Sequence, residues 1–337
     1  MTGQAMTQVG EWTEGTEPAG PERSGGRSLP LAAWAQRYGM LAALVVLFAF
    51  NAFATPFFLT RESLLFILLR QSAPVAIVAV GMAIVIGTGG IDLSVGSVMA
   101  IAGQVGALLV LHGSGVGLAI VCALLAALAC GAFNGTLVAR FGVQPIIATL
   151  ILFIAGRGIA QLITGGQLQP LSNHGFQWIG IAQPLGVPAQ VFIALLVAVA
   201  AAAVIRLTIF GRYVAAVGGN ATAARIAGIP SGRVKLIAYL TCAGLAGLVG
   251  LIVVGANYAS DANNSGLGME LNAIAAVAVA GTPLTGGRVR VWGAVGGAVL
   301  LTLLTNTFIA HGLTKQVADM VEGLVIIAAL AIQRHES

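Results

Sequence analysis

The chain has 337 residues, of which 58% are hydrophobic and only 8% are charged, and its formal net charge is +5. A soluble domain carries about 25% charged residues, so this chain lacks the polar surface that it would need in water. The composition excludes an ordinary soluble domain and predicts an integral membrane protein, in which Lys and Arg report orientation rather than nucleic-acid binding.

The first segment, residues 1–36, is polar and rich in Gly, Pro, Thr and Glu. Such a sequence cannot bury a core and is typical of a disordered tail. It also lacks the basic start and the following apolar stretch of a signal peptide. We therefore predict a disordered cytoplasmic tail over 1–36 and one transmembrane domain over 37–335.

The rest of the chain contains apolar runs that suit membrane-spanning helices, each of which needs about 20 residues. An all-α polytopic fold follows, because a helix satisfies its own backbone hydrogen bonds in lipid. About ten spans are predicted, at 38–58, 66–88, 94–112, 116–139, 144–165, 189–207, 234–258, 270–283, 292–311 and 317–333.

The basic residues orient these spans, since Lys and Arg gather on the cytoplasmic side. With the amino terminus inside, most of them fall on that side, whereas Arg61 and Lys315 fall outside and Arg70 and Arg157 lie in or near spans. Both termini are then predicted to be cytoplasmic. The cytoplasmic set is Arg23, Arg27, Arg37, Arg140, Arg206, Arg212, Arg225, Arg233, Lys235, Arg288, Arg290 and Arg334.

An internal repeat joins two distant parts of the chain. Residues 76–98 align with 273–295, and ten of the 23 aligned residues are identical, including Thr-Gly-Gly at 88–90 and 285–287. Both copies run in the same direction across the membrane in the predicted topology. Parallel repeats of this kind occur in transporters.

Asp92 is a single carboxylate between two apolar runs, directly after Gly89 and Gly90. A carboxylate at membrane depth is costly and usually faces a cavity or a partner. Three interpretations stay open. Asp92 or Ser94 caps the next helix, Asp92 lines a solute path, or Asp92 lies at the cytoplasmic interface.

Arg157 lies well inside the span 144–165, between two glycines, and needs a carboxylate, backbone carbonyls or water as a partner. One interpretation is that it extends toward the outer surface; the other is a polar site or gate. Polar residues continue beyond it at helical spacing, and helix–helix hydrogen bonds would produce the same pattern. They are Gln161, Thr164 and Gln167.

The connection 206–235 is basic, moderately apolar and interrupted by glycines. It predicts two short helices, at 212–217 and 220–228, the second capped by Asn220. This length favours a docking surface for another protein. The alternative is an amphipathic helix on the membrane surface.

On the outer side, the loop 259–271 holds Asp261, Asn263 and Asn264 and ends at Glu270. It is either a contact for solute or a partner protein, or a solvated loop with Glu270 near a helix N-terminus.

No phosphate-binding loop, metal cluster, nucleophile arrangement or dinucleotide fingerprint occurs in the sequence. We therefore predict no enzyme activity, no metal and no cofactor bound by this chain. One possible function is ion-coupled secondary transport, in which acidic residues would carry the ion. They are Asp92, Glu270, Asp319 and Glu322.

Four segments, at 87–103, 133–166, 211–229 and 266–288, resemble the membrane permeases of ribose- and galactose-type ABC sugar importers. The resemblance covers about 40–333, in the same order, and is greatest to galactofuranose importer permeases. It implies a type II importer-like permease fold with about ten helices. One departure is Val289-Arg290, where family members commonly carry Gly and then a small or apolar residue.

The resemblance also implies an assembly in the bacterial inner membrane. Two permease subunits, identical or similar, would form the pathway, two ATPase subunits would bind ATP and Mg, and a periplasmic protein would deliver the sugar. The connection 206–235 would be the coupling loop, seated in an ATPase cleft. Its coupling residues are then Arg212, Asn220, Ala223, Arg225 and Gly228.

We thus predict the permease of an ATP-driven importer for a pentose or a furanose-form hexose, working by alternating access. A neutral sugar needs only weak contacts from amides, hydroxyls and backbone groups along its path. The residues predicted to line that path are Asp92, Asn134, Thr149, Arg157, Asn257, Glu270 and Asn306.

Overall fold

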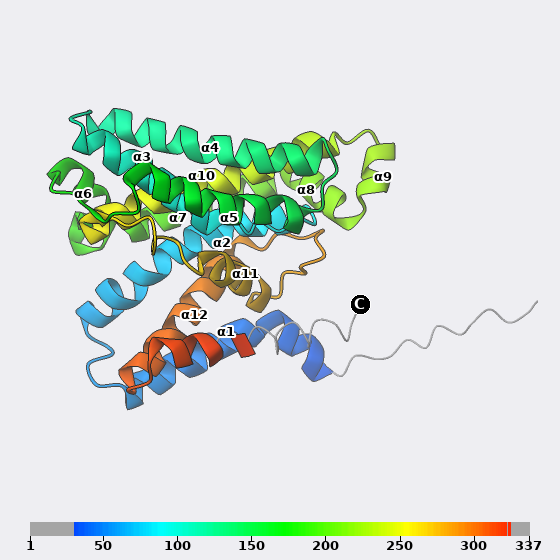
Figure 1. Ribbon diagram of the computed structural model, residues 1–337. Helices are drawn as coiled ribbons and strands as arrows, with labels where there is room; N and C mark the ends of the chain where they lie inside the picture. Colours follow the sequence, from blue (N-terminus) through cyan, green and yellow to red (C-terminus); the bar gives the residue numbers. More distant parts are fainter. Residues whose placement is uncertain (1–29, 322, 325–337) are drawn as a thin grey trace, which may run out of the picture.

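The computed structural model describes residues 30–321 and 323–324 (Figure 1). The first helix, α1 (Pro30–Ala54), begins at a proline, which is favoured in the first turn of a helix. Residues 30–36, predicted as part of the tail, are therefore helical. Most of the predicted tail and most of the predicted span 317–333 lie outside the described residues.

Two buried helices, α2 (Arg70–Gly87) and α10 (Ser231–Asn257), form the centre of the bundle. Both are rich in Gly and Ala, and small residues let helix backbones approach closely in lipid. On α10, Gly250 lies so close to Met99 that a side chain there would overlap the Met99 carbonyl. The helical core thus depends on close backbone packing rather than on large side chains.

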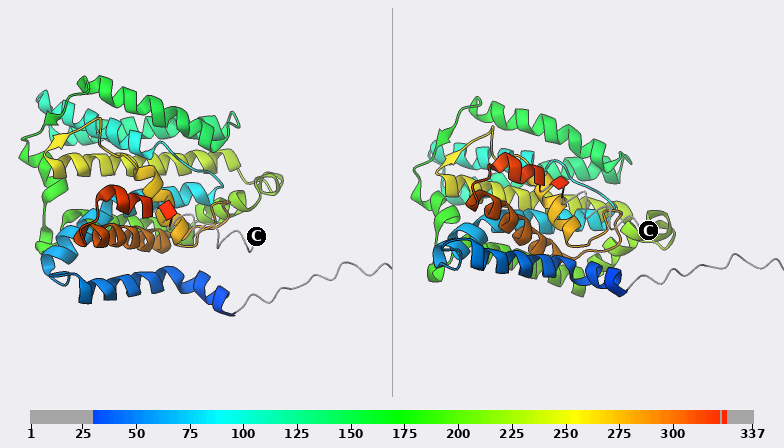
Figure 2. Two further views of the ribbon diagram at one scale, coloured as in Figure 1. Left: turned by 60° about the horizontal axis from the view of Figure 1, so that its bottom comes forward. Right: turned by 90° about the horizontal axis from the view of Figure 1, so that it is seen from below.

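The other helices surround this pair (Figure 1). One side is covered by α3 (Val95–Leu111), α4 (Val116–Ala139) and α5 (Pro145–Thr164). The other side is covered by α7 (Ala189–Leu207), α11 (Met269–Val279) and α12 (Val291–Ala310). Figure 2 shows α1 along the edge of the bundle, and α1 packs on α12.

Six helices of the described part are long and apolar enough to cross a membrane, and three apolar helices are shorter. The predicted count of about ten spans is therefore not confirmed. The shorter ones are Tyr38–Ala54, Val95–Leu111 and Met269–Val279. The six are Glu62–Gly87, Val116–Ala139, Pro145–Thr164, Ala189–Leu207, Ser231–Asn257 and Val291–Ala310.

The internal repeat corresponds to two helix pairs, α2–α3 and α11–α12. In each pair the Thr-Gly-Gly sequence lies in the loop between the helices. In the first copy, α2 continues to Gly87, directly before the Thr-Gly-Gly sequence. In the second copy, α11 already ends at Val279, because Gly281 and Pro283 follow it and interrupt the helix. The two loops meet, since the Gly287 backbone N–H donates to the Gly87 carbonyl oxygen at 3.1 Å.

Short elements lie at the two ends of the bundle (Figure 1). One end carries the π-helix η1 (Glu62–Leu69), α6 (His174–Ile181) and the 3₁₀ turn η2 (Pro184–Gly186). It also carries an antiparallel ladder between β1 (Gln169–Pro170) and β2 (Ala259–Ser260). The opposite end carries α8 (Ile209–Gly219) and α9 (Ala221–Ile226).

Candidate functional site

The segment 209–228, formed by α8 and α9, contains both helices predicted from the sequence. The first helix begins earlier than predicted, at Ile209, and the second ends at Ile226. Asn220 caps the second helix as predicted, because its side-chain oxygen accepts from the backbone N–H groups of Thr222 at 3.0 Å and Ala223 at 2.9 Å.

The two faces of the 209–228 segment differ. Its apolar side chains, including Val214, Val217 and Ala224, are buried against Val234 of α10. The outward face is exposed and carries the apolar side chain of Ile226, which is 84% exposed. The predicted coupling residues all lie exposed there: Arg212, Asn220, Ala223, Arg225 and Gly228. Because the apolar face is covered by protein, it is not free to lie on lipid.

Five glycines meet where the 209–228 segment joins the bundle: Gly87, Gly89, Gly218, Gly286 and Gly287. A side chain at Gly218 would overlap the Gly87 carbonyl and the Gly287 nitrogen. Gly286 has a positive φ of 99°, and a side chain there would overlap the Gly89 backbone, less severely than at Gly218. The end of α8 therefore contacts the start of the first Thr-Gly-Gly loop and the second such loop backbone to backbone at Gly218, in what we call the glycine junction.

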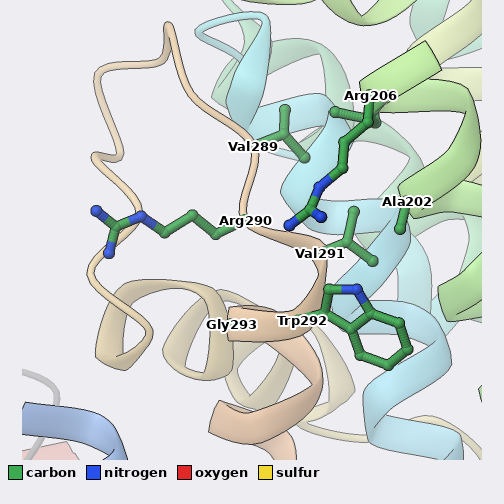
Figure 3. A pocket seen from close by; sticks show the side chains of 8 residues that line it. Ala202, Arg206, Val289, Arg290, Val291, Trp292 and Gly293 are labelled. Atoms are coloured by element: carbon green, nitrogen blue, oxygen red, sulfur yellow. The ribbon is translucent and has the colours of Figure 1, made fainter. Parts of the chain in front are cut away.

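A pocket of about 250 Å³ lies near this junction, between the end of α7 and the start of α12 (Figure 3). The Arg206 side chain extends over Val291, and Trp292 forms the floor. Arg290 extends the other way, and its guanidinium donates to the Ala280 carbonyl at 3.4 Å (Figure 3). The unusual Arg290 of the sequence is thus bound to its own loop rather than directed toward Arg206.

Asp92 lies fully buried in the loop between α2 and α3. Its Oδ1 accepts from the Ser94 hydroxyl at 2.6 Å and from the Ser94 backbone N–H at 2.9 Å. The Ser94 hydroxyl in turn accepts from the Asn134 amide at 2.8 Å. Ser94 is the N-cap of α3 but makes no side-chain cap bond, so Asp92 is the residue that fixes the chain at this helix start.

Thr149 and Tyr239 hold the same loop from the other side. The Thr149 hydroxyl accepts from the Leu93 backbone N–H at 3.1 Å, and the Tyr239 hydroxyl donates to the Ile91 carbonyl at 3.3 Å. The structure therefore brings together three of the predicted path residues, Asp92, Asn134 and Thr149. The sequence analysis missed Tyr239, which was one aromatic residue in an apolar run.

Replacing Ser94 by Ala should destabilise the protein by about 1–3 kcal/mol, because it removes one of the two hydrogen bonds on the buried Asp92 Oδ1 and leaves the Asn134 amide N–H without its partner. The midpoint of thermal unfolding in detergent measures this. Thr241→Ala is the control, since the Thr241 hydroxyl bonds only the Ile237 carbonyl of its own helix. Equal midpoints for the two variants would contradict the role of Ser94.

Arg157 extends from α5 to the outer loop 259–271. Its Nη1 donates to the carbonyls of Ala262 at 2.9 Å and Ser265 at 2.6 Å. One turn along, the Gln161 amide donates to the Asn263 side-chain oxygen at 2.9 Å. The partners of Arg157 are thus backbone carbonyls, one of the three partner types that the sequence left open.

The outer loop has its own internal bonds. The hydrogen bond from the Asn264 side chain lowers the pKa of the Asp261 carboxyl, and the nearby backbone N–H groups and Arg157 act in the same direction. This stabilisation is present above the ordinary pKa of a carboxyl and is lost as the pH falls through the lowered value. The loop is therefore a built turn rather than an unstructured solvated one.

Glu270 begins α11 beneath this loop and is almost fully buried. Its Oε2 has no hydrogen-bond partner within the described residues, and it lies against Gly96 of α3. Its attraction to the Arg157 guanidinium is electrostatic, across the outer loop. Arg157 and Glu270 thus form a second polar group, separate from that of Asp92.

The last two predicted path residues lie apart from both groups. Asn257 is exposed at the end of α10, and Asn306 is half-buried on α12. The predicted set therefore does not form one site. Of the acidic residues in the ion-coupled rival, Asp319 is ion-paired with Lys315 at 2.8 Å and Glu322 lies outside the described residues.

Comparison with known families identifies the chain. Residues 64–330 match the family described as branched-chain amino acid transport system / permease component. The chain belongs to this family. The long apolar helices, the repeat and the exposed 209–228 segment are thus those of a transport permease, and the resemblance found in the sequence is confirmed.

Two relatives come from Escherichia coli (strain K12). The ribose import permease protein is 40% identical over 92% of this chain and 98% of its own length. The galactofuranose transporter permease protein is 36% identical over 89% of this chain and 90% of its own length.

A fructose import permease protein of Bifidobacterium longum is 36% identical over 79% of this chain and 76% of its own length. No solved structure matches the chain. Since the relatives are permeases, this chain is a membrane permease and not itself an enzyme, and the ion-coupled alternative is not favoured.

Proposed function

We propose that this chain is the permease subunit of an ATP-driven importer of a monosaccharide, a pentose or a furanose-form hexose. The support is that relatives at 36–40% identity are import permeases for galactofuranose, ribose and fructose. All three sugars are neutral and rich in hydroxyl groups. Such a solute is recognised by amide, hydroxyl and backbone groups without a fixed counter-charge.

The coupling element in this proposal is the 209–228 segment. ATP and Mg bind to two partner ATPase subunits, which hold the exposed face around Arg225 and Ile226. Closure of the ATPases moves α8, and the glycine junction passes this movement to both repeat loops because the Gly218 backbone lies directly against theirs. The pathway then changes the side to which it opens, and a periplasmic binding protein delivers the sugar.

The same end of the molecule supports the proposed orientation. Several arginines lie at or near the ends of the helices there, which favours a cytoplasmic location by the positive-inside rule. They are Arg140, Arg206, Arg225, Arg233 and Arg288. The outer loop 259–271 then faces the periplasm. The proposed location is the bacterial inner membrane, with both termini cytoplasmic and a second permease subunit, identical or similar, alongside.

Arg225→Glu and Gly228→Pro are expected to uncouple ATP hydrolysis from uptake while the chain still inserts in the membrane. Arg225 lies on the exposed face, and proline cannot adopt the positive φ of 79° at Gly228. Sugar uptake and ATP hydrolysis by the assembled transporter in proteoliposomes measure this. Arg140→Glu is the matched control, an equal charge reversal on an exposed residue at the same end. Normal coupling in both variants would contradict the proposal.

The substrate class needs its own experiment. Uptake of labelled D-ribose, D-galactose and D-fructose is compared with uptake of L-leucine, because the family description names branched-chain amino acids. We expect ATP-dependent uptake of at least one sugar and none of leucine. Uptake of leucine alone, or uptake driven by a proton gradient without ATP, would overturn the proposed function.

A further inference from the structure

The helix that begins with η1 changes its geometry at Arg70. η1 is a π-helix over Glu62–Leu69 and continues directly into α2. π-Helical stretches are rare and occur frequently at functional sites. Pro74 lies inside α2, and because proline has no N–H, the Arg70 carbonyl loses its usual intrahelical hydrogen bond. The change of helix geometry thus lies at a charged residue, Arg70.

A cavity of about 290 Å³ lies at this break, between the start of α2, the start of α7 and the end of α10. Its lining includes Phe66 and Arg70 from the broken helix, with Asn257 from α10 opposite. Gln190 of α7 is fixed as part of the wall, because its amide donates to the Gly180 carbonyl at 2.6 Å. The volume is close to the lower end of the range for small-molecule sites, about 300–1,000 Å³.

Three polar side chains around the cavity have no partner in the described part of the chain. The side chains of the half-buried Arg70 and of the exposed Gln71 and Asn257 make no hydrogen bond or ion pair there. Because these side chains line the cavity and have no protein partner there, their donors and acceptors are available to a polar ligand.

The chemistry of the lining selects among polar ligands. Guanidinium and amide groups donate to hydroxyl oxygens, and the amide oxygens accept from hydroxyl groups. Phe66, whose ring lies beneath the Arg61 guanidinium at 6.0 Å, adds apolar surface to the lining. No acidic side chain lines the cavity, so the ammonium group of an amino acid would find the Arg70 cation but no carboxylate. This combination fits a neutral, hydroxyl-rich ring.

We propose that this cavity is a binding site for a monosaccharide, which the sugar occupies on its way through the permease. The inference rests on the proposed function. The site lies at the end of the bundle opposite the 209–228 segment, because α2 begins at Arg70 and ends beside Gly218, and α10 begins near α9 and ends at Asn257. It therefore receives sugar on the side away from the ATPases.

The test measures uptake and ATP hydrolysis together in proteoliposomes that contain the whole transporter with its loaded binding protein. The probes are labelled D-ribose, D-galactose and D-fructose. Asn257→Ala and Gln71→Ala each remove one contact, and Gln71→Trp fills the cavity. We expect the alanine variants to lower sugar uptake at least threefold and Gln71→Trp to lower it at least tenfold, with ATP hydrolysis unchanged.

Gln167→Ala is the matched control, since Gln167 is exposed at the same end and makes no side-chain hydrogen bond within the described residues. Normal uptake by Gln71→Trp and both alanine variants would overturn the site while leaving the proposed function intact. A parallel fall in uptake and ATP hydrolysis would also overturn it, because that pattern indicates a structural role. If the unchanged protein takes up none of the three sugars, the proposed function itself fails.

Discussion

Gly218→Ala is expected to abolish uptake, whereas Gly219→Ala, one residue along the same helix, should leave it intact. A Cβ on Gly218 would overlap the Gly87 carbonyl and the Gly287 nitrogen, two atoms that are themselves hydrogen-bonded at 3.1 Å. Both are backbone atoms, one at the buried end of α2 and one in the half-buried loop after α11, so neither can move aside as a flexible side chain could. Overpacking of this kind costs about 1–3 kcal/mol, and here it also separates a buried hydrogen bond.

Gly219 is a matched control because a Cβ there meets nothing within 4 Å. Uptake by the assembled transporter and the thermal midpoint in detergent are measured for both variants. We expect Gly218→Ala to lower uptake at least tenfold and to lower the midpoint, while Gly219→Ala changes neither. Equal behaviour of the two variants would contradict the close backbone contact at the glycine junction.

The sequence was sufficient to predict the class of protein, because composition and apolar runs reflect the requirement for internal hydrogen bonding in lipid. It also predicted the Asn220 cap and the two-helix form of the 209–228 segment, since capping depends on residues two and three positions away. The number of spans was harder to predict. Helices such as α11 are shortened by Gly281 and Pro283, whose effect depends on how the following loop packs.

The contacts of the candidate site residues could not be predicted from the sequence. The need of Arg157 for a partner follows from the cost of burying a charge, but its partners are the carbonyls of Ala262 and Ser265, about 105 residues away in the chain. Backbone carbonyls have no residue-specific pattern in a sequence. The seven predicted path residues were selected as polar residues in apolar runs, and that criterion does not show that Asp92, Glu270 and Asn257 lie in three different places.

Arg157→Leu is expected to disorder the outer loop and to lower uptake at least tenfold. The variant removes two charge-assisted hydrogen bonds, each worth about 1.5–3 kcal/mol. It also removes the cation that attracts the buried Glu270 carboxylate, which has no hydrogen-bond partner for its Oε2 within the described residues. Together these losses are a large fraction of the usual stability of a protein, about 5–15 kcal/mol.

The double variant Arg157→Leu with Glu270→Gln separates these two losses. If the uncompensated carboxylate contributes, the double variant should be more stable than Arg157→Leu alone, because a buried amide costs less than a buried unpaired charge. Gln161→Ala is the control, since it removes a single exposed bond to the same loop. Thermal midpoints and protease cleavage within 259–271 are the measurements. If protease cleaves the loop 259–271 equally slowly in Arg157→Leu and Gln161→Ala, Arg157 does not hold this loop in place.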